Sequence, residues 1–224
     1  MAVLPTTGKE FRFNNARMHK MSKKKVYGIG INDVLGFSKT REGKNWCQVM
    51  RRGYCPKLKM RRPTYANVTV HPDWLIASNF KNSKIHDHYI PGYCLDKDIL
   101  VPGNKQYSET ACRYVPQYVN NVLLDRGKYR GILPLGVSMH GKGFQAHCSQ
   151  MQINGKPKSV AFGTFKTPEL AHREWQTAKI VAIEKVIARY KTEPMPLREI
   201  IAALKLRIRK LKNDIRNKCI TVKL

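Results

Sequence analysis

Apolar and polar positions alternate over three short stretches in the second half of the chain, Gly136–His140, Phe144–Gln150 and Ser159–Phe165. Alternation with a period of two is typical of strands that bury one face. The sequences HGKG and NGKP separate these stretches and are typical of hairpin turns. The pattern therefore predicts a three-stranded antiparallel sheet.

Two helices are predicted after this sheet. Thr167, Pro168 and Glu169 form a helix start, and apolar residues recur at helical spacing to about Tyr190. After the break at Pro194-Met195-Pro196, a second helix is expected over 197–217, with one apolar stripe and Arg or Lys on its other face. That stripe predicts either docking on the body of the protein or self-association, and a contact with the DNA backbone is the alternative.

The first half of the chain predicts a mixture of short helices and strands. Helices are expected over 44–60 and 74–80, with an extended piece at 68–70 and strands and turns over 26–43. The stretch 92–124 predicts a strand ending in Asp96, a loop, a second strand over 110–115, and a helix that opens at Pro116. The whole chain is therefore expected to be of the α+β class.

One face of the predicted sheet carries an unusual set of polar side chains. Phe144, Ala146 and Cys148 are expected to face the following helix, so their neighbours face outward. Such donors and acceptors fit a sheet laid in a DNA groove, where they read base edges, although a merely polar face is the alternative. The candidate DNA-binding residues are Ser138, His140, Lys142, Gln145, His147, Ser149, Lys156 and Lys158.

Charge narrows the choice of partner. The chain of 224 residues has 42 Lys and Arg against 15 Asp and Glu, a formal net charge of +27. This excess predicts a polyanionic partner, with nucleic acid favoured over an anionic membrane surface. Residues 1–25 are expected to form a basic arm that either contacts phosphates or only aids solubility. The chain has no signal peptide and no apolar run of membrane-spanning length, so we expect a soluble intracellular protein without membrane association. None of its six cysteines forms a CxxC pair, which argues against a zinc finger.

Asp96 and Asn120 are the candidate metal ligands. An acidic strand end that faces an Asn on a packed helix can hold a divalent cation, because hard cations prefer oxygen ligands. The sequence His86-Asp87-His88 also invites a metal interpretation, but an HxH pair without a further ligand is more typical of a solvated loop.

The order and spacing of several motifs resemble phage-encoded HNH homing endonucleases that carry an AP2-like DNA-binding domain. The matching segments, which together span roughly residues 26–190, include PTY at 63–65, LDKDIL at 95–100, PGNK at 102–105, Asn120, GVS at 136–138 and GTF at 163–165. The resemblance implies an HNH-like nuclease domain over 26–127 with a ββα-metal core at 92–124, and an AP2-like domain over 128–192. A C-terminal amphipathic basic helix over 193–224 follows.

The resemblance also implies a catalytic site. In that fold one divalent ion, Mg²⁺ or Mn²⁺, binds the scissile phosphate, and Asp96 and Asn120 match its ligands. Lys97 stands where the widespread motif has the His that activates water, although the phage subfamily shows LDKD as well. Asp98, His71, His86 and His88 are therefore candidate bases, and Asn104 is the nearest match to the Asn that orients the base.

Three functions follow as expectations. The first is a site-specific endonuclease that nicks or cleaves double-stranded DNA, located in the host cytoplasm and associated with the nucleoid. The second is a catalytically inactive DNA-binding or nucleoprotein-assembly protein built on the same scaffold. The third is binding of structured RNA, since charge alone does not distinguish the two nucleic acids.

Overall fold

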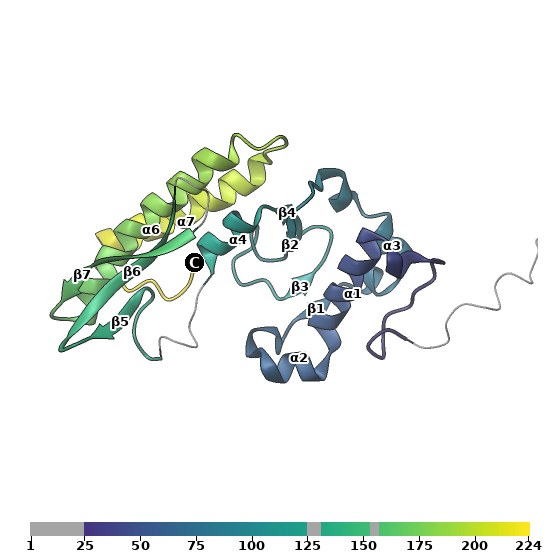
Figure 1. Cartoon of the computed structure of the whole chain (residues 1–224), viewed down its shortest axis with the longest axis horizontal. Helices are drawn as coiled ribbons and strands as arrows, with labels where there is room; N and C mark the ends of the chain where they lie inside the picture. Colours follow the sequence, from purple (N-terminus) through teal and green to yellow (C-terminus); the bar gives the residue numbers. More distant parts are fainter. Residues whose placement is uncertain (1–24, 125–130, 153–156) are drawn as a thin grey trace, which may run out of the picture.

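The computed structural model describes residues 25–124, 131–152 and 157–224, and its architecture is mixed α+β (Figure 1). The strands form three small sheets: a parallel pair β1–β3, an antiparallel pair β2–β4, and the antiparallel sheet β5–β6–β7. The molecule is elongated, with the N-terminal elements at one end and the three-stranded sheet and the two longest helices at the other. The predicted basic arm lies outside the described residues except for Lys25, as does Lys156.

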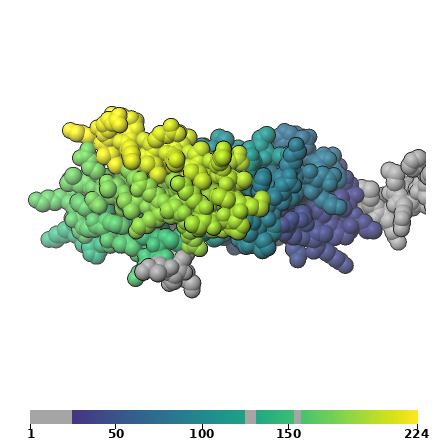
Figure 2. Space-filling view, turned by 90° about the horizontal axis from the view of Figure 1, so that it is seen from above, coloured from purple at the N-terminus to yellow at the C-terminus, as the bar shows by residue number. Residues whose placement is uncertain are grey.

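The three-stranded sheet and its helices follow the sequence pattern closely. The strands are β5 (Val137–His140), β6 (Gly143–Met151) and β7 (Pro157–Phe165). Helix α6 (Pro168–Tyr190) covers one face of the sheet, and the hydroxyl oxygen of Thr167 accepts a hydrogen bond from the amide of Leu170 at its start. Helix α7 (Arg198–Arg216) then packs along α6 (Figure 2). Local patterning was sufficient here because caps, prolines and periodicity agree.

The helix expected over 44–60 is two helices, so that prediction was wrong in its continuity. Helix α1 (Arg41–Tyr54) ends before Cys55, and α2 (Pro56–Arg61) begins with a proline. Cys55 is extended, with φ −81° and ψ 110°. The residue before a proline is pushed out of the helical region by the proline ring, which explains the break.

The helix expected over 74–80 is also interrupted. A 3₁₀ turn, η4 (Pro72–Leu75), precedes a short helix, α3 (Ala77–Lys81), and Ile76 between them is extended. Ile76 bridges to Ile31: the amide of Ile31 donates to the carbonyl of Leu75, and the amide of Ala77 donates to the carbonyl of Ile31. A contact across the chain thus replaces the hydrogen bonds that a continuous helix would have made.

The stretch 92–124 forms the predicted hairpin and helix. Strand β2 (Cys94–Asp96) pairs with β4 (Arg113–Val115), and α4 (Gln117–Leu123) follows Pro116. The second strand is shorter than the expected 110–115 because Ser108 holds a turn: its hydroxyl accepts from the amide of Ala111, and its carbonyl accepts from the amide of Cys112. Strands β1 (Thr69–Val70) and β3 (Gln106–Tyr107) pair beside this hairpin. The remaining turns are η2 (Phe37–Lys39), η3 (Pro63–Tyr65) and η5 (Lys84–His88).

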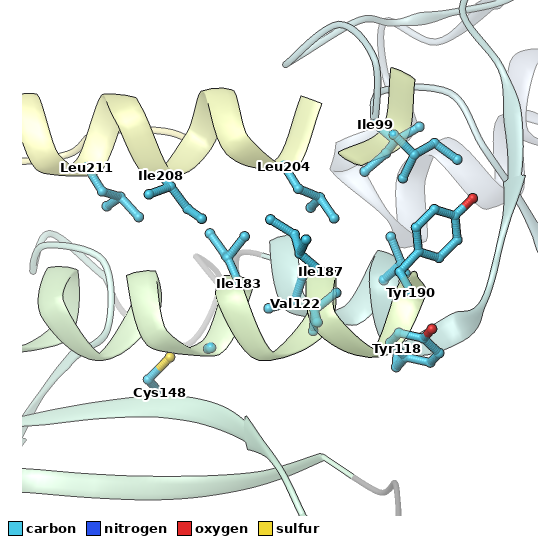
Figure 3. Close-up of a cluster of buried hydrophobic side chains, with 14 of the residues drawn as sticks. Ile99, Tyr118, Val122, Cys148, Ile183, Ile187, Tyr190, Leu204, Ile208 and Leu211 are labelled. Atoms are coloured by element: carbon cyan, nitrogen blue, oxygen red, sulfur yellow. The ribbon is translucent and has the colours of Figure 1, made fainter. Parts of the chain in front are cut away.

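Two buried clusters lie on opposite faces of the β2–β4 hairpin. Val115 belongs to the cluster formed with α4, α6 and α7, whereas Tyr114 belongs to the cluster formed with α1 and α3. The first cluster joins Ile99, Tyr118 and Val122 to side chains of α6 and α7 (Figure 3). It therefore crosses the boundary expected between the nuclease and AP2-like domains, so the two segments share buried apolar surface.

The apolar stripe of α7 is buried within the chain. Leu204, Ile208 and Leu211 point toward α6 (Figure 3). The tail after α7 is tied back as well: the amide of Thr221 donates to Nε2 of His172 at 2.9 Å, and its hydroxyl donates to Asp214 at 2.7 Å. Of the alternatives for this helix, docking on the body is the one observed, and the stripe is not open to a second copy.

Candidate metal site and nucleic-acid surfaces

The β2–β4 hairpin and helix α4 bring the two candidate metal ligands to one face. Side chains alternate along a strand, so Cys94 and Asp96 point to the same side of the hairpin. The side-chain amide of Asn120, on α4, lies 3.7 Å from the sulfur of Cys94. Asn120 therefore lies over the face of the hairpin that carries Asp96.

Asp96 is a buried carboxylate with an imposed orientation. Its Oδ1 accepts hydrogen bonds from the backbone amides of Asp98 and Ile99, both at 2.8 Å. Burial, together with the nearby Asp98 carboxylate, raises the pKa of Asp96 to about 6. A bound cation would offset the cost of holding this negative charge away from water.

The donor set at this position fits Mg²⁺ or Mn²⁺ better than zinc. Mg²⁺ is commonly held by one or two protein oxygen ligands, with water and substrate phosphate completing the octahedron. The carboxylate of Asp96 and the amide oxygen of Asn120 are ligands of that kind. Within the described part of the chain, no group of three or more His, Cys, Asp or Glu side chains is placed to hold a metal ion.

Lys97 and Asn104 are hydrogen-bonded to each other. The ammonium of Lys97 is buried and donates to the carbonyl of Asn104 at 2.9 Å and to Oδ2 of Asp98 at 3.0 Å. The side chain of Asn104 donates in turn to the carbonyls of Lys97 and Gln106, at 2.6 and 2.7 Å. The Lys97 ammonium thus donates to two fixed acceptors and holds its positive charge beside the Asp98 carboxylate.

Asp98 is the carboxylate nearest to Asp96 in this loop. Burial pushes the pKa of Asp98 upward, but hydrogen bonding with Asp96 and the charge of Lys97 outweigh burial and lower it. The two carboxyl groups therefore differ: Asp98 stays ionised to lower pH than Asp96.

The histidines considered as bases lie in different surroundings. Ring nitrogens of His86 contact the carbonyl of Phe80 at 2.9 Å and the hydroxyl of Tyr114 at 3.4 Å. Tyr114 pairs with Leu95, so its side chain is on the opposite face of the hairpin from Asp96, which removes His86 as a base for this site.

His71, at the start of η4, and His88, in η5, lie outside the β2–β4 hairpin. His71 lines an open polar groove together with Glu109, and its Nδ1 lies 3.5 Å from a carboxylate oxygen of Asp73. His88, in η5, has an Nδ1 that is buried without a hydrogen-bond partner among the described residues.

Two arginines that the sequence pattern did not predict contact the end of β2 and the loop after it. Arg207 of α7 donates to the carbonyl of Asp98 at 3.0 Å. Arg113, the cross-strand partner of Asp96, is paired with Glu199 of α7. A signal for Arg207 was present: it falls three residues after Leu204 and four before Leu211, on the buried stripe of α7, where a basic residue is unexpected.

The outward face of the three-stranded sheet holds most of the predicted DNA-binding residues. Ala146, Cys148 and Gln150 are buried toward α6, and the side chains between them are half-buried on the other face. Ser138 pairs with Gln145 across β5 and β6, so the two share that face. The outward set is Ser138, His140, Gln145, His147 and Ser149, with Lys142 exposed in the adjoining turn.

Lys158 departs from this set. It pairs with Gln150, whose side-chain amide donates to the carbonyl of Ala178 on α6. Paired residues in an antiparallel sheet point to the same side, so Lys158 is exposed on the helix side of the sheet and does not belong to the outward face. A bulge in β7 shifts the register, because Gln145 pairs with Thr164 whereas His147 pairs with Ala161, and the alternation alone did not reveal it.

A basic surface lies on the N-terminal half. The sequence from Gly43 to Pro72 has no Asp or Glu, and it carries seven Lys and Arg. Helix α2 buries none of its residues, and Lys57, Arg61 and Arg62 are exposed there. Lys105, which follows the loop residue Asn104, donates to the carbonyl of Thr64 and links this surface to the candidate metal site.

Comparison of this chain with models of protein families, with curated proteins and with solved structures finds no match. No helix in the described residues combines the length and the apolarity that crossing a bilayer requires.

Proposed function

We propose that this protein is a metal-dependent endonuclease of the HNH type that acts on double-stranded DNA. The observation that carries the proposal is the position of Asp96 at the end of β2, with Asn120 of α4 over the same face of the hairpin. A hairpin and a helix with these two oxygen ligands can hold one divalent cation.

Each residue of the loop has a part in this proposal. Asp96 and Asn120 would hold the ion, which when bound would bind the scissile phosphate and stabilise the leaving oxygen. The two amide hydrogen bonds to Asp96 orient its carboxylate before substrate arrives. Asn104 fixes the backbone of Lys97, and Lys97 supplies a positive charge beside the loop. Asp98, held ionised by Lys97, is the proposed acceptor of the proton of the attacking water.

DNA contact is proposed at two surfaces. The outward sheet face offers hydroxyl, amide and imidazole groups suited to base edges. The acid-free surface around α2 is suited to phosphates, because cations that neutralise phosphates release condensed counterions.

The test is nicking of supercoiled plasmid with and without Mg²⁺. We expect the wild-type protein to form the nicked circle only with the metal, and Asp96→Ala to lose roughly 100-fold or more of this rate. Asp73→Ala is the matched control, because the Asp73 carboxylate is exposed and lies in η4, outside the β2–β4 hairpin. Asp96→Ala should still bind DNA; undiminished nicking by this variant would contradict the site assignment.

A second candidate function is DNA binding without cleavage. The observation that favours it is the ammonium of Lys97, which donates to Asp98 and Asn104 and stands where the widespread HNH motif has a histidine base. This function predicts a steep dependence of affinity on salt and no nicked product with Mg²⁺ or Mn²⁺. A metal-dependent nick made by the wild-type protein excludes it.

A further inference from the structure

Arg207 is a buried cation on a helix face that is otherwise apolar. It is 2% exposed and lies on α7 between Leu204 and Leu211. One terminal nitrogen donates to the carbonyl of Ala203 and the other to the carbonyl of Asp98, each at 3.0 Å. Its Nε is buried with no hydrogen-bond partner in the part of the chain that the structure describes.

Packing does not account for an arginine at this position. A buried guanidinium stays charged and must replace its hydration with fixed partners, which a leucine on the same stripe would not require. The facing charges are the carboxylates of Asp96 and Asp98, and both act favourably on the guanidinium. The buried charge is therefore matched to the loop that holds the candidate metal ligand.

The contact acts on one particular peptide group. The carbonyl of Asp98 and the amide of Ile99 belong to the same planar peptide unit. Arg207 binds its carbonyl end, and Oδ1 of Asp96 accepts from its amide end at 2.8 Å. A cation at one end and a carboxylate at the other polarise the peptide and strengthen both hydrogen bonds.

A second contact from α7 supports the same region. Glu199, two turns earlier on the helix, is paired with Arg113, and Arg113 lies opposite Asp96 in the hairpin. The C-terminal helix thus reaches the end of β2 from two positions. Neither contact involves the outward face of the sheet.

We propose that Arg207 is a positioning residue of the metal site: through the peptide between Asp98 and Ile99 it sets the orientation of the Asp96 carboxylate. This inference rests on the proposed metal-dependent function. It makes α7 part of the catalytic module, so that the site is complete only when the C-terminal helix is docked. DNA affinity, which depends on other surfaces, does not require it.

The test compares Arg207→Met and Arg207→Lys with the control Arg209→Met. Methionine keeps the apolar stem and removes both hydrogen bonds, lysine keeps the charge and loses the two-pronged geometry, and Arg209 is exposed on the same helix. Four quantities are measured: binding of Mn²⁺ alone by electron paramagnetic resonance, the Mg²⁺ concentration for half-maximal nicking, the Kd for plasmid DNA, and the free energy of unfolding.

We expect Arg207→Met to weaken Mn²⁺ binding and raise the Mg²⁺ half-saturation by about 10-fold or more, with the Kd for DNA unchanged within about twofold. Arg207→Lys should fall between this variant and the wild type, and Arg209→Met should match the wild type. Wild-type metal affinity in a folded Arg207→Met overturns the inference while the nuclease proposal stands. If that variant does not fold, as judged by circular dichroism, wild-type metal affinity in Arg207→Lys overturns it.

The two proposals fail in different ways. A wild-type protein that neither binds Mn²⁺ nor nicks DNA removes the proposed function and the inference with it. A wild-type protein that nicks DNA, with variants at position 207 that lose DNA affinity and metal affinity in parallel with their stability, assigns Arg207 to structure alone and overturns only the inference.

Discussion

The phenol of Tyr118 donates a 2.7 Å hydrogen bond to the carboxylate of Glu193, which joins α4 to the turn between α6 and α7. Tyr93, just before β2, donates to the other oxygen of the same carboxylate at 2.8 Å. Burial of the phenols, with Glu193 beside them, raises the pKa of both tyrosines well above the usual range. One carboxylate therefore ties the residue before β2 and the first turn of α4 to the turn between α6 and α7.

The first prediction concerns the stability of this junction. Tyr118→Phe removes the hydrogen bond and leaves the packed ring, so we expect the free energy of unfolding to fall by about 1–2 kcal/mol. Because the buried cluster crosses the junction, urea unfolding should remain a single transition by circular dichroism and by tryptophan fluorescence. Tyr27→Phe, at an exposed tyrosine, is the control. Two separate transitions would show that the segments unfold independently.

The second prediction is a pH dependence at Asp96. Its pKa in the folded protein, about 6, lies above the ordinary 3.8, so the fold loses stability as pH rises from about 4 to 6 and Asp96 ionises. Asp96→Asn removes that cost and keeps an oxygen for the two amides. In metal-free buffer we expect the variant to be more stable than wild type by about 1–3 kcal/mol at pH 8, with no difference near pH 4.

Asp98→Asn gives the opposite sign and serves as the matched comparison. The pKa of Asp98 is lowered in the fold, so its ionised form contributes stability above the ordinary pKa, and this is lost as pH falls through the folded value. We expect Asp98→Asn to be less stable than wild type at pH 8 and closer to it in acid. Equal effects of the two substitutions at pH 8 would contradict the assigned environments.

The third prediction concerns sequence recognition by the sheet. His147→Ala and Gln145→Ala should each reduce the preference for a selected duplex over random DNA by about 1–3 kcal/mol, because these side chains are suited to base edges. The slope of affinity against salt should stay unchanged. Lys158→Ala, on the helix side of the sheet, should leave the preference intact. The duplex would be selected from a random library with the wild-type protein.

The fourth prediction distinguishes the acid-free surface around α2 from the exposed basic residues of α7 as the site of phosphate contact. Replacing Arg61 and Arg62 with Gln should lower the slope of log affinity against log salt by about 2, since each phosphate contact contributes close to one. The control replaces Lys205 and Arg209, which are exposed on α7. A slope that falls only in the control would mean that DNA lies along α7 instead of α2.

Local sequence determined the C-terminal sheet and its helices. Alternation gave three strands, Thr167 gave the start of α6, and the prolines at 194 and 196 gave its separation from α7. Each of these signals acts within a few residues, where backbone preference and burial agree. Pro56 was also a local signal for the break between α1 and α2. The prediction of one continuous helix followed the periodic apolar positions on both sides of Pro56 instead.

The order of motifs alone predicted that Asp96 and Asn120 lie on one face, because a hairpin followed by a helix brings the strand end and the helix face together. Only the tertiary structure decided what surrounds them. It fixed Lys97 between Asp98 and Asn104, separated His86 onto the other face, and brought Arg207 to the Asp98 carbonyl across 109 residues. A buried charge is stabilised by whichever groups the folded chain places beside it, and no local pattern specifies groups that distant.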